Sequence, residues 1–395
     1  MPEAFIVDAV RSPMGRGKSG GSLSSLHAVE LLAQTITGLL ARHTTLDPAR
    51  ADDVLIGCVS QGGEQAATPG RMAWLAAGLP PTVPATTIDR RCGSGLQAMM
   101  FAAHAVQAGA YDLVIAGGLE SMSRVPMGSA RMGQDVYGPS VTTRYAPGLV
   151  SQGIAAELVA SKWGLDRETL DAYAAGSHER AAAAEAAGRF DGQIVPITVP
   201  GREEPVDRDE TIRPGTTLEK LAGLKPAFRN DADSARFPEI NWHITAGNSS
   251  QITDGASVVL IASERAVREI GLTPRARFHA ESVVGDDPIM MLTGPIPATE
   301  LALERAGMRV DQLDHIEVNE AFAPVPLAWA SEFPGGRDAL NPDGGAIALG
   351  HPLGASGARL FTSLLAGLES RGGRYGLLTI CEAGGMANAT IFERI

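Results

Sequence analysis

The chain has 395 residues, of which 44% are hydrophobic and 20% are charged, and this is the composition of a globular protein with a large core. Its net charge of −12 argues against a surface whose main function is to bind nucleic acid or another polyanion. Three cysteines in so long a chain do not make a disulfide framework, and unpaired thiols suit a reducing cytosol, so we expect a cytoplasmic protein. No apolar run approaches the ~18 residues of a membrane-spanning helix, and the first residues are typical of a strand rather than a signal peptide.

Strand-like and helical segments alternate in the first part of the chain, which is the pattern of an α/β fold. Strands are expected at residues 4–9, 53–57, 87–89 and 113–118, and helices at 28–43, 70–77 and 94–109. The alternation of strands and helices recurs near the C-terminus, with helices at 299–307 and 354–365 and strands at 315–318 and 376–381. In each half a Gly/Ser-rich turn opens a helix of small residues, which leads to a strand and a Gly-Gly pair. This repetition indicates an internal duplication.

The segment from 121 to 251 interrupts the repeat. It opens with many Met, Gly and Pro residues, continues with helical stretches at 153–163 and 167–187, and then turns polar and Pro-rich at 196–236. A stretch this long between repeats predicts an inserted subdomain rather than a structureless loop. We therefore divide the chain into an N-terminal half (1–120 and 252–273), an inserted domain (121–251) and a C-terminal half (274–395).

Two cysteines lie beside glycine clusters. Cys92 stands where a short strand meets the Gly-Ser-Gly start of a helix, and the free N–H groups of a helix N-terminus stabilise a thiolate and lower the thiol pKa. Cys381 ends a buried strand and precedes Glu-Ala-Gly-Gly, and a strand end that faces an open turn is a usual place for a catalytic group. The alternative for each is a small buried residue that packs at a turn or in a strand, which is also our interpretation of Cys58.

An imidazole and an amide accompany these thiols in glycine-rich or strand-end contexts. His351 lies in Gly-His-Pro, and a positioned imidazole takes a proton from a thiol. Asn319 begins an Asn-Glu-Ala-Phe stretch after the strand at 315–318, where it can donate to a developing oxyanion with Glu320 orienting it. A hydrogen-bonded structural histidine and a strand-terminal cap are the alternatives. Two thiols, an imidazole and an amide are a set suited to acyl transfer between thioesters.

Two other site types are rejected. The glycines of residues 345–350 have the spacing of a phosphate-binding loop, but His351 replaces the lysine that such a loop requires. No Cys/His cluster has metal-ligand spacing, so no metal site is expected.

Together the motifs resemble the thiolase family over essentially the whole chain. The matching segments are residues 11–13, 89–98, 117–123, 245–250, 293–295, 319–322, 344–357 and 381–386. The resemblance implies an α/β fold with a five-layered α-β-α-β-α core made of two duplicated halves, plus an inserted loop domain that receives coenzyme A. It also implies that coenzyme A is a substrate or product and that no cofactor is tightly bound.

The resemblance assigns catalytic roles by motif position. Cys92 would be the nucleophile that accepts the acyl group, His351 its activating base, and Cys381 the acid/base that handles the α-proton. One oxyanion hole would be formed by His351 and a water held by Asn319, and a second by the backbone N–H groups of Cys92 and Ala383. The implied substrate contacts are Ser250 with the pantetheine, Lys225 with the nucleotide end of coenzyme A, and Met291 and Phe322 in the acyl pocket.

The implied activity is reversible acyl transfer between acetyl-CoA and acyl-CoA, either as a Claisen condensation or as thiolysis of a 3-ketoacyl-CoA. An acetyl-CoA C-acetyltransferase or C-acyltransferase of fatty-acid metabolism, built as a homodimer or homotetramer, fits this description. A β-ketoacyl synthase is the nearest competing enzyme, but it typically pairs its cysteine with two histidines. A non-catalytic protein that binds CoA or lipid on this scaffold would also fit the motifs, as would the β-subunit of a fatty-acid oxidation complex with an α-subunit partner.

Three positions depart from the family pattern. Ala383 stands where the first of three glycines is usual, and it would be strained if that position required a positive φ. Glu382 would raise the pKa of the neighbouring thiol if it pointed inward, but as the next residue on a strand it is expected to face the other side. Residues 150–153 read Val-Ser-Gln-Gly where short-chain biosynthetic members usually carry His-Met-Gly, which leaves the acyl chain length open.

Overall fold

The structure, a computed structural model, describes residues 3–395, and its strands form one large mixed sheet. The strand order is β4-β3-β5-β6-β1-β7-β10-β9-β8, and the two-residue β2 (Gly15–Arg16) pairs with β6. The strands of the first half are β1 (Ala4–Arg11), β3 (Asp53–Gly57), β4 (Ala85–Ile88), β5 (Leu113–Ser121) and β6 (Thr253–Ser263). Those of the second half are β7 (Ala276–Gly285), β8 (His315–Val318), β9 (Tyr375–Glu382) and β10 (Met386–Arg394).

The pairing pattern shows the duplication directly. In the first half β3 is parallel to β5, β5 is antiparallel to β6, and β6 is antiparallel to β1. In the second half β8 is parallel to β9, β9 is antiparallel to β10, and β10 is antiparallel to β7. The halves join where Phe5 and Ile6 of β1 pair with Arg277 and Ala276 of β7. The same sequence of strand directions therefore occurs twice, as the repetition of motifs predicts.

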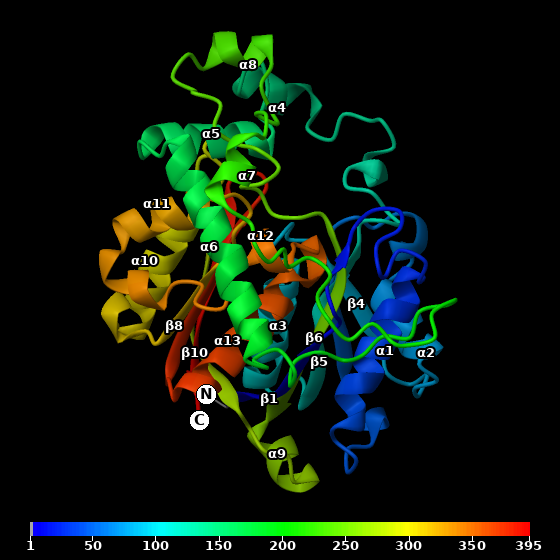
Figure 1. Ribbon diagram of the computed structural model, residues 1–395. Helices are drawn as coiled ribbons and strands as arrows, with labels where there is room; N and C mark the ends of the chain where they lie inside the picture. The colour runs from blue at the N-terminus through cyan, green and yellow to red at the C-terminus, as the bar shows by residue number, and fades with distance from the viewer. Residues whose placement is uncertain (1–2) are drawn as a thin grey trace.

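Helices cover and separate the two halves of the sheet (Figure 1). The helices α3 (Ser94–Gln107) and α13 (Ser356–Arg371) lie between them, where their apolar side chains form one core cluster with both sets of strands. The helices α1 (Ala28–Ala41) and α2 (Pro69–Ala76) cover the outer face of the first half, and α10 (Pro295–Ala306) and α11 (Pro324–Glu332) that of the second. The layers run α-β-α-β-α, which confirms the predicted fold.

Glycines let the two middle helices approach closely near their N-termini. A Cβ atom on Gly357 would lie 2.1 Å from the backbone nitrogen of Leu96, and one on Gly95 would lie 2.7 Å from the carbonyl oxygen of Gly354. Real Cβ atoms do not come so near to backbone, so a larger side chain at either position would push the helices apart. The glycine clusters beside Cys92 and His351 thus bring the two helix starts together.

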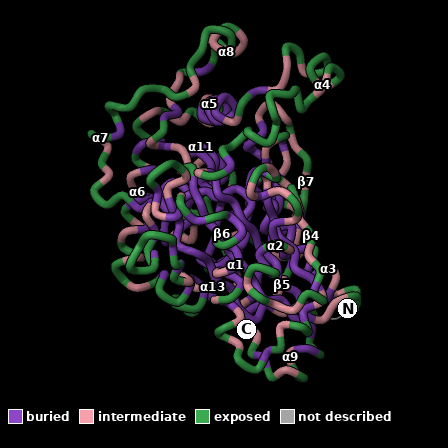
Figure 2. The backbone as a smooth tube through the Cα atoms, turned by 90° about the vertical axis from the view of Figure 1, so that its right-hand side faces the viewer, coloured by how far each residue is buried: buried purple, intermediate pink, exposed green. Residues whose placement is uncertain are grey.

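The inserted segment forms helices above the core, namely α4 (Gly138–Arg144), α5 (Gln152–Lys162), α6 (Arg167–Ala186), α7 (Leu218–Ala222) and α8 (Asp231–Arg236). α5 is buried along most of its length and packs in the core cluster of the second half, whereas α4 and α8 lie exposed at the tip (Figure 2). The predicted helices at 153–163 and 167–187 correspond to α5 and α6. The remaining helices are α9 (Glu264–Ile270), α12 (Ala346–Leu349) and six 3₁₀ turns (Pro48–Arg50, Gly63–Gln65, Ser129–Arg131, Val310–Gln312, Pro334–Ala339 and Leu353–Ala355).

Several element boundaries differ from those expected. α10 begins at Pro295, four residues before the predicted start, because prolines fit the first turn of a helix, where their missing N–H has no partner to lose. The sequence pattern does not predict β6 and β7, although β6 is buried along all of its length at the centre of the sheet. Within residues 3–395 no helix is both long and apolar enough to cross a membrane.

Candidate active site

Cys92 lies in a tight turn between β4 and α3, and only 4% of its surface is exposed. Arg91 adopts a φ of +49°, which is uncommon for a residue other than glycine. Ser94, the first residue of α3, holds the turn because its Oγ accepts from the backbone nitrogen of Arg90 at 2.8 Å and donates to the carbonyl of Arg91 at 2.6 Å. The thiol therefore sits at a fixed and partly strained position at the start of a central helix.

Burial raises the pKa of the Cys92 thiol to about 12, and the charge of Glu382 adds to this increase. A hydrogen bond from the side chain of Gln152 lowers the pKa, but by less. The sequence predicts that the helix N-terminus lowers this pKa, but the pKa is raised, because burial contributes more than the groups that lower it. Cys92 is therefore a neutral thiol at rest, and a base would be needed for it to react as a nucleophile.

Cys381 is fully buried near the end of β9 and lies within electrostatic range of Cys92. Burial raises its pKa well above the ordinary value, and a negative charge on Cys92 is the next largest cause. The structure thus brings the two predicted thiols into one site and couples their ionisation. A thiolate at Cys92 makes a second thiolate at Cys381 harder to form.

His351 lies in the turn between α12 and α13, and the turn is held by several hydrogen bonds. Its backbone nitrogen donates to the carbonyl of Gln251 at 3.1 Å and to Oγ1 of Thr253 at 3.0 Å. Its Nδ1 lies 2.6 Å from Oγ of Ser356, and the same Oγ donates to the carbonyl of Pro352 at 2.9 Å. A hydroxyl has one hydrogen, and we assign it to the carbonyl of Pro352, so that the Ser356 oxygen accepts from Nδ1–H. Nε2 of the neutral ring then carries the free lone pair.

Burial lowers the pKa of His351 to about 3, and the charge of the buried Arg359 contributes to the decrease. The imidazole is therefore neutral at physiological pH. A neutral ring with a free Nε2 can accept a proton, and a low pKa means that it releases the proton readily in the next step. This is the state that a base for a buried thiol requires.

Asn319 is fully buried directly after β8, and its Nδ2 lies 3.5 Å from Nε2 of His351. Its backbone nitrogen donates to the carbonyl of Thr379 at 3.1 Å, which fixes the residue against β9. Its side-chain Oδ1 has no hydrogen-bond partner among residues 3–395. The Asn319 amide and the His351 imidazole therefore lie next to each other in the site. The amide oxygen of Asn319 remains able to accept a hydrogen bond from a water or a ligand.

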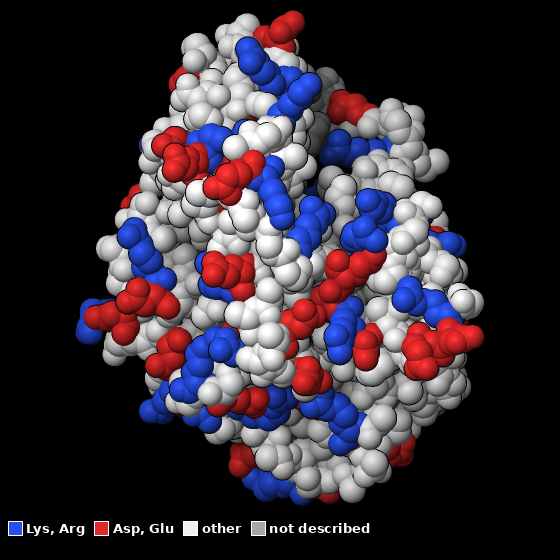
Figure 3. All heavy atoms as spheres, in the orientation of Figure 1, with Lys and Arg blue, Asp and Glu red and all other residues white. Residues whose placement is uncertain are grey.

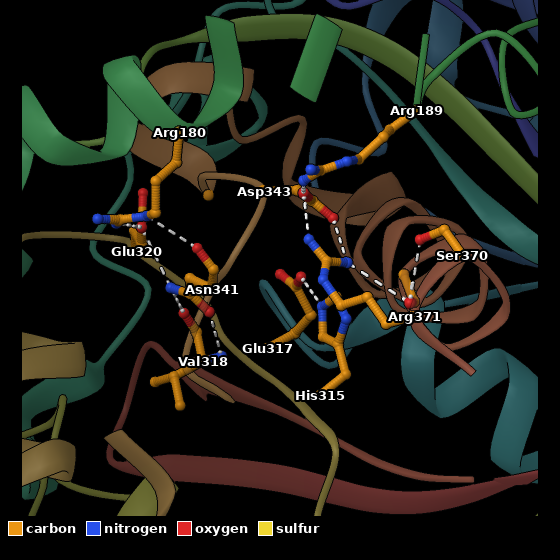
Figure 4. Close-up of polar contacts among 12 residues, drawn as sticks. Arg180, Arg189, His315, Glu317, Val318, Glu320, Asn341, Asp343, Ser370 and Arg371 are labelled. Carbon is orange, nitrogen blue, oxygen red and sulfur yellow. Dashed lines mark hydrogen bonds and ion pairs between the residues drawn. The ribbon is translucent and has the colours of Figure 1, made fainter. Parts of the chain in front are cut away.

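Glu320 holds the loop that carries Asn319 rather than Asn319 itself. Its buried carboxylate accepts four hydrogen bonds, from Tyr173 Oη (2.9 Å), Ser177 Oγ (2.7 Å), Asn341 Nδ2 (3.1 Å) and the backbone nitrogen of Ile347 (3.1 Å). Figure 4 shows Asn341 between Glu320 and the end of β8 at Val318, with which it exchanges two further bonds. The predicted orienting contact between Glu320 and Asn319 is absent from the described residues. The carboxylate joins α6 and α12 to the site instead.

Glu120 is a second supporting carboxylate, and sequence reasoning gave it no role. Its oxygens accept from the backbone nitrogens of Val59 (3.0 Å), Ser60 (3.0 Å) and Gly354 (2.9 Å), and from Nε2 of Gln65 (2.9 Å). It therefore ties the turn that follows His351 to the first half of the molecule. The signal was present in the Gly-Gly-Leu-Glu stretch at 117–120, which ends a buried strand.

Ala383 lies in the hairpin turn between β9 and β10. Among residues 3–395, the positive φ values of this turn belong to Gly384 (+97°) and Gly385 (+74°), so the alanine causes no left-handed strain. Glu382 packs against Gly93 in the turn of Cys92, and its charge contributes to the raised pKa of Cys381 as well as that of Cys92, an effect that the expected orientation away from the thiol did not include. The Ala383 substitution therefore leaves the geometry of the turn intact.

The predicted substrate contacts fall into two groups. Ser250 donates from its backbone nitrogen to Ala321, so it lies beside the loop that carries Asn319. Phe322 is buried and meets Phe228 of the inserted segment edge to face, at 5.9 Å between ring centroids. Met291 is buried in the loop between β7 and α10 and belongs to the same core cluster as Phe322 and Cys381. Lys225 is exposed on the inserted segment, and no described contact joins it to the catalytic residues.

Gln152 is the other residue that sequence reasoning left without a role in the chemistry. It is the first residue of α5, with Ser151 as the N-cap, and its side chain reaches Cys92 from the inserted segment. The signal was its place in the Val-Ser-Gln-Gly departure. No group of His, Cys, Asp or Glu in the described residues is arranged to hold a metal ion.

Comparisons with known proteins identify the family of this chain. Residues 4–265 match the family model of the thiolase N-terminal domain, and residues 272–394 match that of the thiolase C-terminal domain. Steroid 3-ketoacyl-CoA thiolase FadA6 of Mycobacterium tuberculosis is 48% identical over 403 residues, which cover 100% of this chain and 95% of the relative. A 3-oxoadipyl-CoA/3-oxo-5,6-dehydrosuberyl-CoA thiolase of Escherichia coli is 44% identical, with 100% of both chains covered. The crystal structure of the Bacillus anthracis acetyl-CoA acetyltransferase has a TM-score of 0.88 and 37% identity, and the match covers 100% of this chain and 99% of that one.

Proposed function

The chain belongs to the thiolase family and is an acyltransferase, and from this premise we propose that it transfers acyl groups between CoA thioesters through an acyl-enzyme on Cys92. The observation that supports this most is the site itself, in which a buried thiol, a neutral imidazole, an amide and a second thiol meet at the starts of the two middle helices. Thiolate is both a good nucleophile and a good leaving group, as reversible transfer between thioesters requires.

In the first step Nε2 of His351 takes the proton of the Cys92 thiol, and the sulfur attacks the carbonyl carbon of the acyl-CoA. The bond from that carbon to the CoA sulfur then breaks, and the leaving thiolate takes the proton from the imidazolium. The low pKa of His351, about 3, favours this return of the proton. Ser356 holds Nδ1 throughout, so the ring presents Nε2 in both directions of transfer.

In the second step we assign Cys381 as the base that removes the α-proton of acetyl-CoA. Acylation removes the negative charge that Cys92 would otherwise carry, and that charge is a cause of the raised pKa at Cys381. Formation of the acyl-enzyme therefore makes the second thiol easier to ionise, which places the two steps in order. The Cys381 thiol first gives its own proton to the neutral imidazole of His351, and the resulting thiolate takes the α-proton. The carbanion attacks the acyl carbonyl and the bond to the Cys92 sulfur breaks, giving a 3-ketoacyl-CoA. The released Cys92 thiolate takes the proton from the imidazolium, and thiolysis is the reverse.

We propose that Asn319 and His351 form one oxyanion hole and that the backbone N–H groups of Cys92 and Ala383 form the other. Nε2–H donates in the first of these once the ring has accepted a proton. The unpartnered Oδ1 and the Nδ2 of Asn319 supply an acceptor and a donor for the bridging water of that hole. The unstrained turn at Ala383 supports the second.

For substrate, we propose a 3-ketoacyl-CoA with an acyl group larger than acetyl, cleaved by free coenzyme A. The relatives named above act on steroid and dicarboxylic acyl groups by their names. Ser250, Met291 and Phe322 lie beside the catalytic loops, which supports their assignment to the pantetheine and acyl ends. In Figure 3, Lys and Arg side chains gather around a hollow below the upper lobe, which suits the phosphates of coenzyme A. Lys225, which is exposed on the inserted segment, is our candidate contact for those phosphates.

We further propose a cytoplasmic homodimer or homotetramer with no tightly bound cofactor, in which residues 121–251 receive coenzyme A between an N-terminal half (1–120 and 252–273) and a C-terminal half (274–395). The exposed apolar side chains Met127, Met132 and Val136 near the start of that segment support a contact with another subunit or chain. A fatty-acid oxidation α-subunit is the alternative occupant, and co-purification distinguishes it from a second copy.

The test is thiolysis of acetoacetyl-CoA and of a longer 3-ketoacyl-CoA by added coenzyme A, with wild type, Cys92→Ala and the control Cys58→Ala. We expect wild type and Cys58→Ala to turn over the longer substrate faster, and Cys92→Ala to lose about 10³-fold or more in kcat. Full activity of Cys92→Ala would exclude the proposed acyl-enzyme. A preference for acetoacetyl-CoA would replace the substrate proposal with a short-chain one.

A further inference from the structure

Glu382 is a buried carboxyl group that the proposed chemistry does not use. It is the last residue of β9 and none of its surface is exposed. Neither of its two side-chain oxygens has a hydrogen-bond partner among residues 3–395. Most buried carboxylates are paired or accept several hydrogen bonds, as Glu120 and Glu320 do here. An unpaired one beside an active site therefore calls for a functional explanation.

The carboxyl group lies directly against the turn that carries the nucleophile. A Cβ atom built on Gly93 would be 2.0 Å from Oε1 of Glu382 and 2.8 Å from Nδ2 of Asn388. Asn388, on the neighbouring β10, donates that Nδ2 to the carbonyl of Gly93 at 3.1 Å. Position 93 therefore has to be glycine, and the Glu382 side chain fills the space beneath the turn. Its placement follows from the packing of β9 and β10 against the start of α3.

The charged groups around Glu382 do not neutralise it by direct pairing. Asp89 and Arg90 face it from the loop before the nucleophile, Cys92 from the start of α3, and Cys381 from its own strand. Arg90 acts on Glu382 only through its charge, because both Glu382 oxygens and the Nε of Arg90 are buried without a hydrogen-bond partner among residues 3–395. The neighbour on β10, Asn388, carries no charge. An isolated carboxylate in this position would be costly, so the acid form is favoured.

The electrostatics agree with the geometry. Burial raises the pKa of Glu382 to about 8, with Arg90 opposing the increase and Asp89 adding to it. The acid is therefore mostly neutral at physiological pH. Its ionised form is, after burial, the largest cause of the raised pKa at Cys92. A proton on Glu382 and a negative charge on the Cys92 sulfur are thus linked, because each makes the other easier to form.

We propose that Glu382 is a positioning residue for the nucleophile, held as a neutral acid beneath the turn of Cys92 and Gly93, and that loss of its proton suppresses the reactivity of Cys92. The inference rests on the proposed role of Cys92 as the acyl acceptor. The proton stays on Glu382 during acyl transfer, and no step passes through it. The alkaline limb of activity is set by this carboxyl group as well as by the thiols.

The test is the rate of Cys92 alkylation by iodoacetamide as a function of pH in wild type and in Glu382→Gln, with the modified cysteine identified by peptide mass spectrometry. Glutamine keeps the size of the side chain and cannot ionise. We expect the two proteins to react equally below about pH 6.5, and the variant to react about five- to tenfold faster above about pH 9. The pH profile of kcat should extend further into the alkaline range in the variant.

Glu317→Gln is the matched control. Glu317 is a fully buried carboxyl group on β8 with a pKa raised by burial and one unpartnered oxygen, but it bonds to His315 and is not among the charges that act on Cys92. We expect its alkylation profile to follow wild type. A rate ratio for Glu382→Gln that does not change with pH, or an equal change in Glu317→Gln, would overturn the proposal.

Infrared difference spectra provide a second measurement that does not depend on the activity of the variant. The spectrum of wild type minus Glu382→Gln should contain the carbonyl band of a protonated carboxylic acid near neutral pH, and this band should disappear at alkaline pH. A carboxylate signal at neutral pH would overturn the proposal. Alkylation requires no turnover, so failure of this inference is separate from failure of the proposed acyl-enzyme, which Cys92→Ala tests.

Discussion

The two halves of the molecule place the same local structure at the start of each middle helix, yet the two turns carry different chemistry. Each helix begins at a serine that follows a constrained turn, Ser94 after Arg91 and Ser356 after His351. Ser94 uses its hydroxyl entirely on the backbone of its turn, whereas Ser356 also accepts from the imidazole. The duplication thus produced one turn whose thiol, the proposed nucleophile, receives no bond from the serine, and one turn whose imidazole, the proposed base, is held by it.

The carboxyl groups that support the two turns differ in the same way. Glu120 holds the base turn with a carboxylate that accepts four hydrogen bonds, one of them from Gly354. Glu382 lies beneath the nucleophile turn with no hydrogen bond in the described residues. A base that must keep one orientation is best held by a carboxylate whose hydrogen bonds are all made. A thiol that must become a thiolate is best placed beside a neutral acid, because a neighbouring negative charge would raise its pKa. Glu120 therefore chiefly orients its turn, although its charge also contributes to the raised pKa of Cys92, whereas Glu382 acts on Cys92 chiefly through its charge.

The largest effect should come from removing the base. His351→Gln keeps a polar side chain of similar reach but cannot accept and release the thiol proton, and we expect kcat for thiolysis to fall by about 10²- to 10⁴-fold. His315→Gln is the control, because His315 is also buried and its ring bonds to Glu317 (Figure 4). Steady-state kinetics with saturating coenzyme A measure both. Near wild-type kcat in His351→Gln would mean that another group takes the proton.

The next effect separates the two serines. Ser356→Ala leaves Nδ1 of His351 without its acceptor, so the tautomer that frees Nε2 is no longer selected, and we expect a loss of about 10- to 100-fold in kcat/KM. Ser94→Ala removes the same atom at the equivalent position of the other half but touches no catalytic side chain. It should lower the melting temperature while leaving the pH dependence of kcat unchanged. Equal changes in both pH profiles would refute the distinction between the turns.

Much of this arrangement was predictable, because short sequence patterns such as glycine clusters and apolar runs indicate it. The glycine clusters at Cys92 and His351 mark close backbone contacts, and β8 was predicted with its observed bounds, His315–Val318. β6 was not predicted, because its eleven residues are buried on both faces and show no alternation of polar and apolar side chains. The four hydrogen bonds to Glu120 and the contact of Glu382 with Gly93 join residues that are far apart in the sequence. Only the packed structure reveals such contacts.

The raised pKa of Cys92 shows where a local rule gives the wrong sign. A helix N-terminus lowers a thiol pKa when the thiol is near water, but here burial and an acidic neighbour contribute more. Neither the burial nor the position of Glu382 can be deduced from the residues around Cys92. The same long-range packing explains why Glu320, adjacent to Asn319 in sequence, bonds to α6 and α12 instead.

The two supporting carboxyl groups should respond oppositely when each is replaced by glutamine. In Glu120→Gln an amide nitrogen, which cannot accept a hydrogen bond, faces backbone N–H donors. This should lower the free energy of unfolding by about 2 to 4 kcal/mol throughout the neutral pH range. Glu382→Gln should instead become more stable than wild type as the pH rises. Denaturant unfolding of both variants and wild type across the pH range measures these changes.

The sign for Glu382 follows from its protons. Its pKa is about 8 in the folded protein and 4.5 in the ordinary state, so between these values the folded chain holds a proton that the unfolded chain has lost. Wild type therefore loses stability relative to Glu382→Gln from about pH 4.5 to about pH 8, by at most roughly 5 kcal/mol, and the difference is constant above that range. A difference that does not vary with pH would mean that Glu382 is already ionised in the native state.

The smallest effect should come from Gln152, which reaches the nucleophile from the inserted segment. Its hydrogen bond lowers the pKa of Cys92, so Gln152→Met, which restores the residue expected from the family pattern, should raise that pKa and slow alkylation of Cys92 at about pH 8 by a few-fold. Gln134→Met, at an exposed position of the same segment, is the control. Because Glu382 and Gln152 act on the same sulfur with opposite sign, the double variant Glu382→Gln, Gln152→Met should fall between the single ones. Unchanged alkylation in Gln152→Met would contradict the effect of the Gln152 hydrogen bond on the pKa of Cys92.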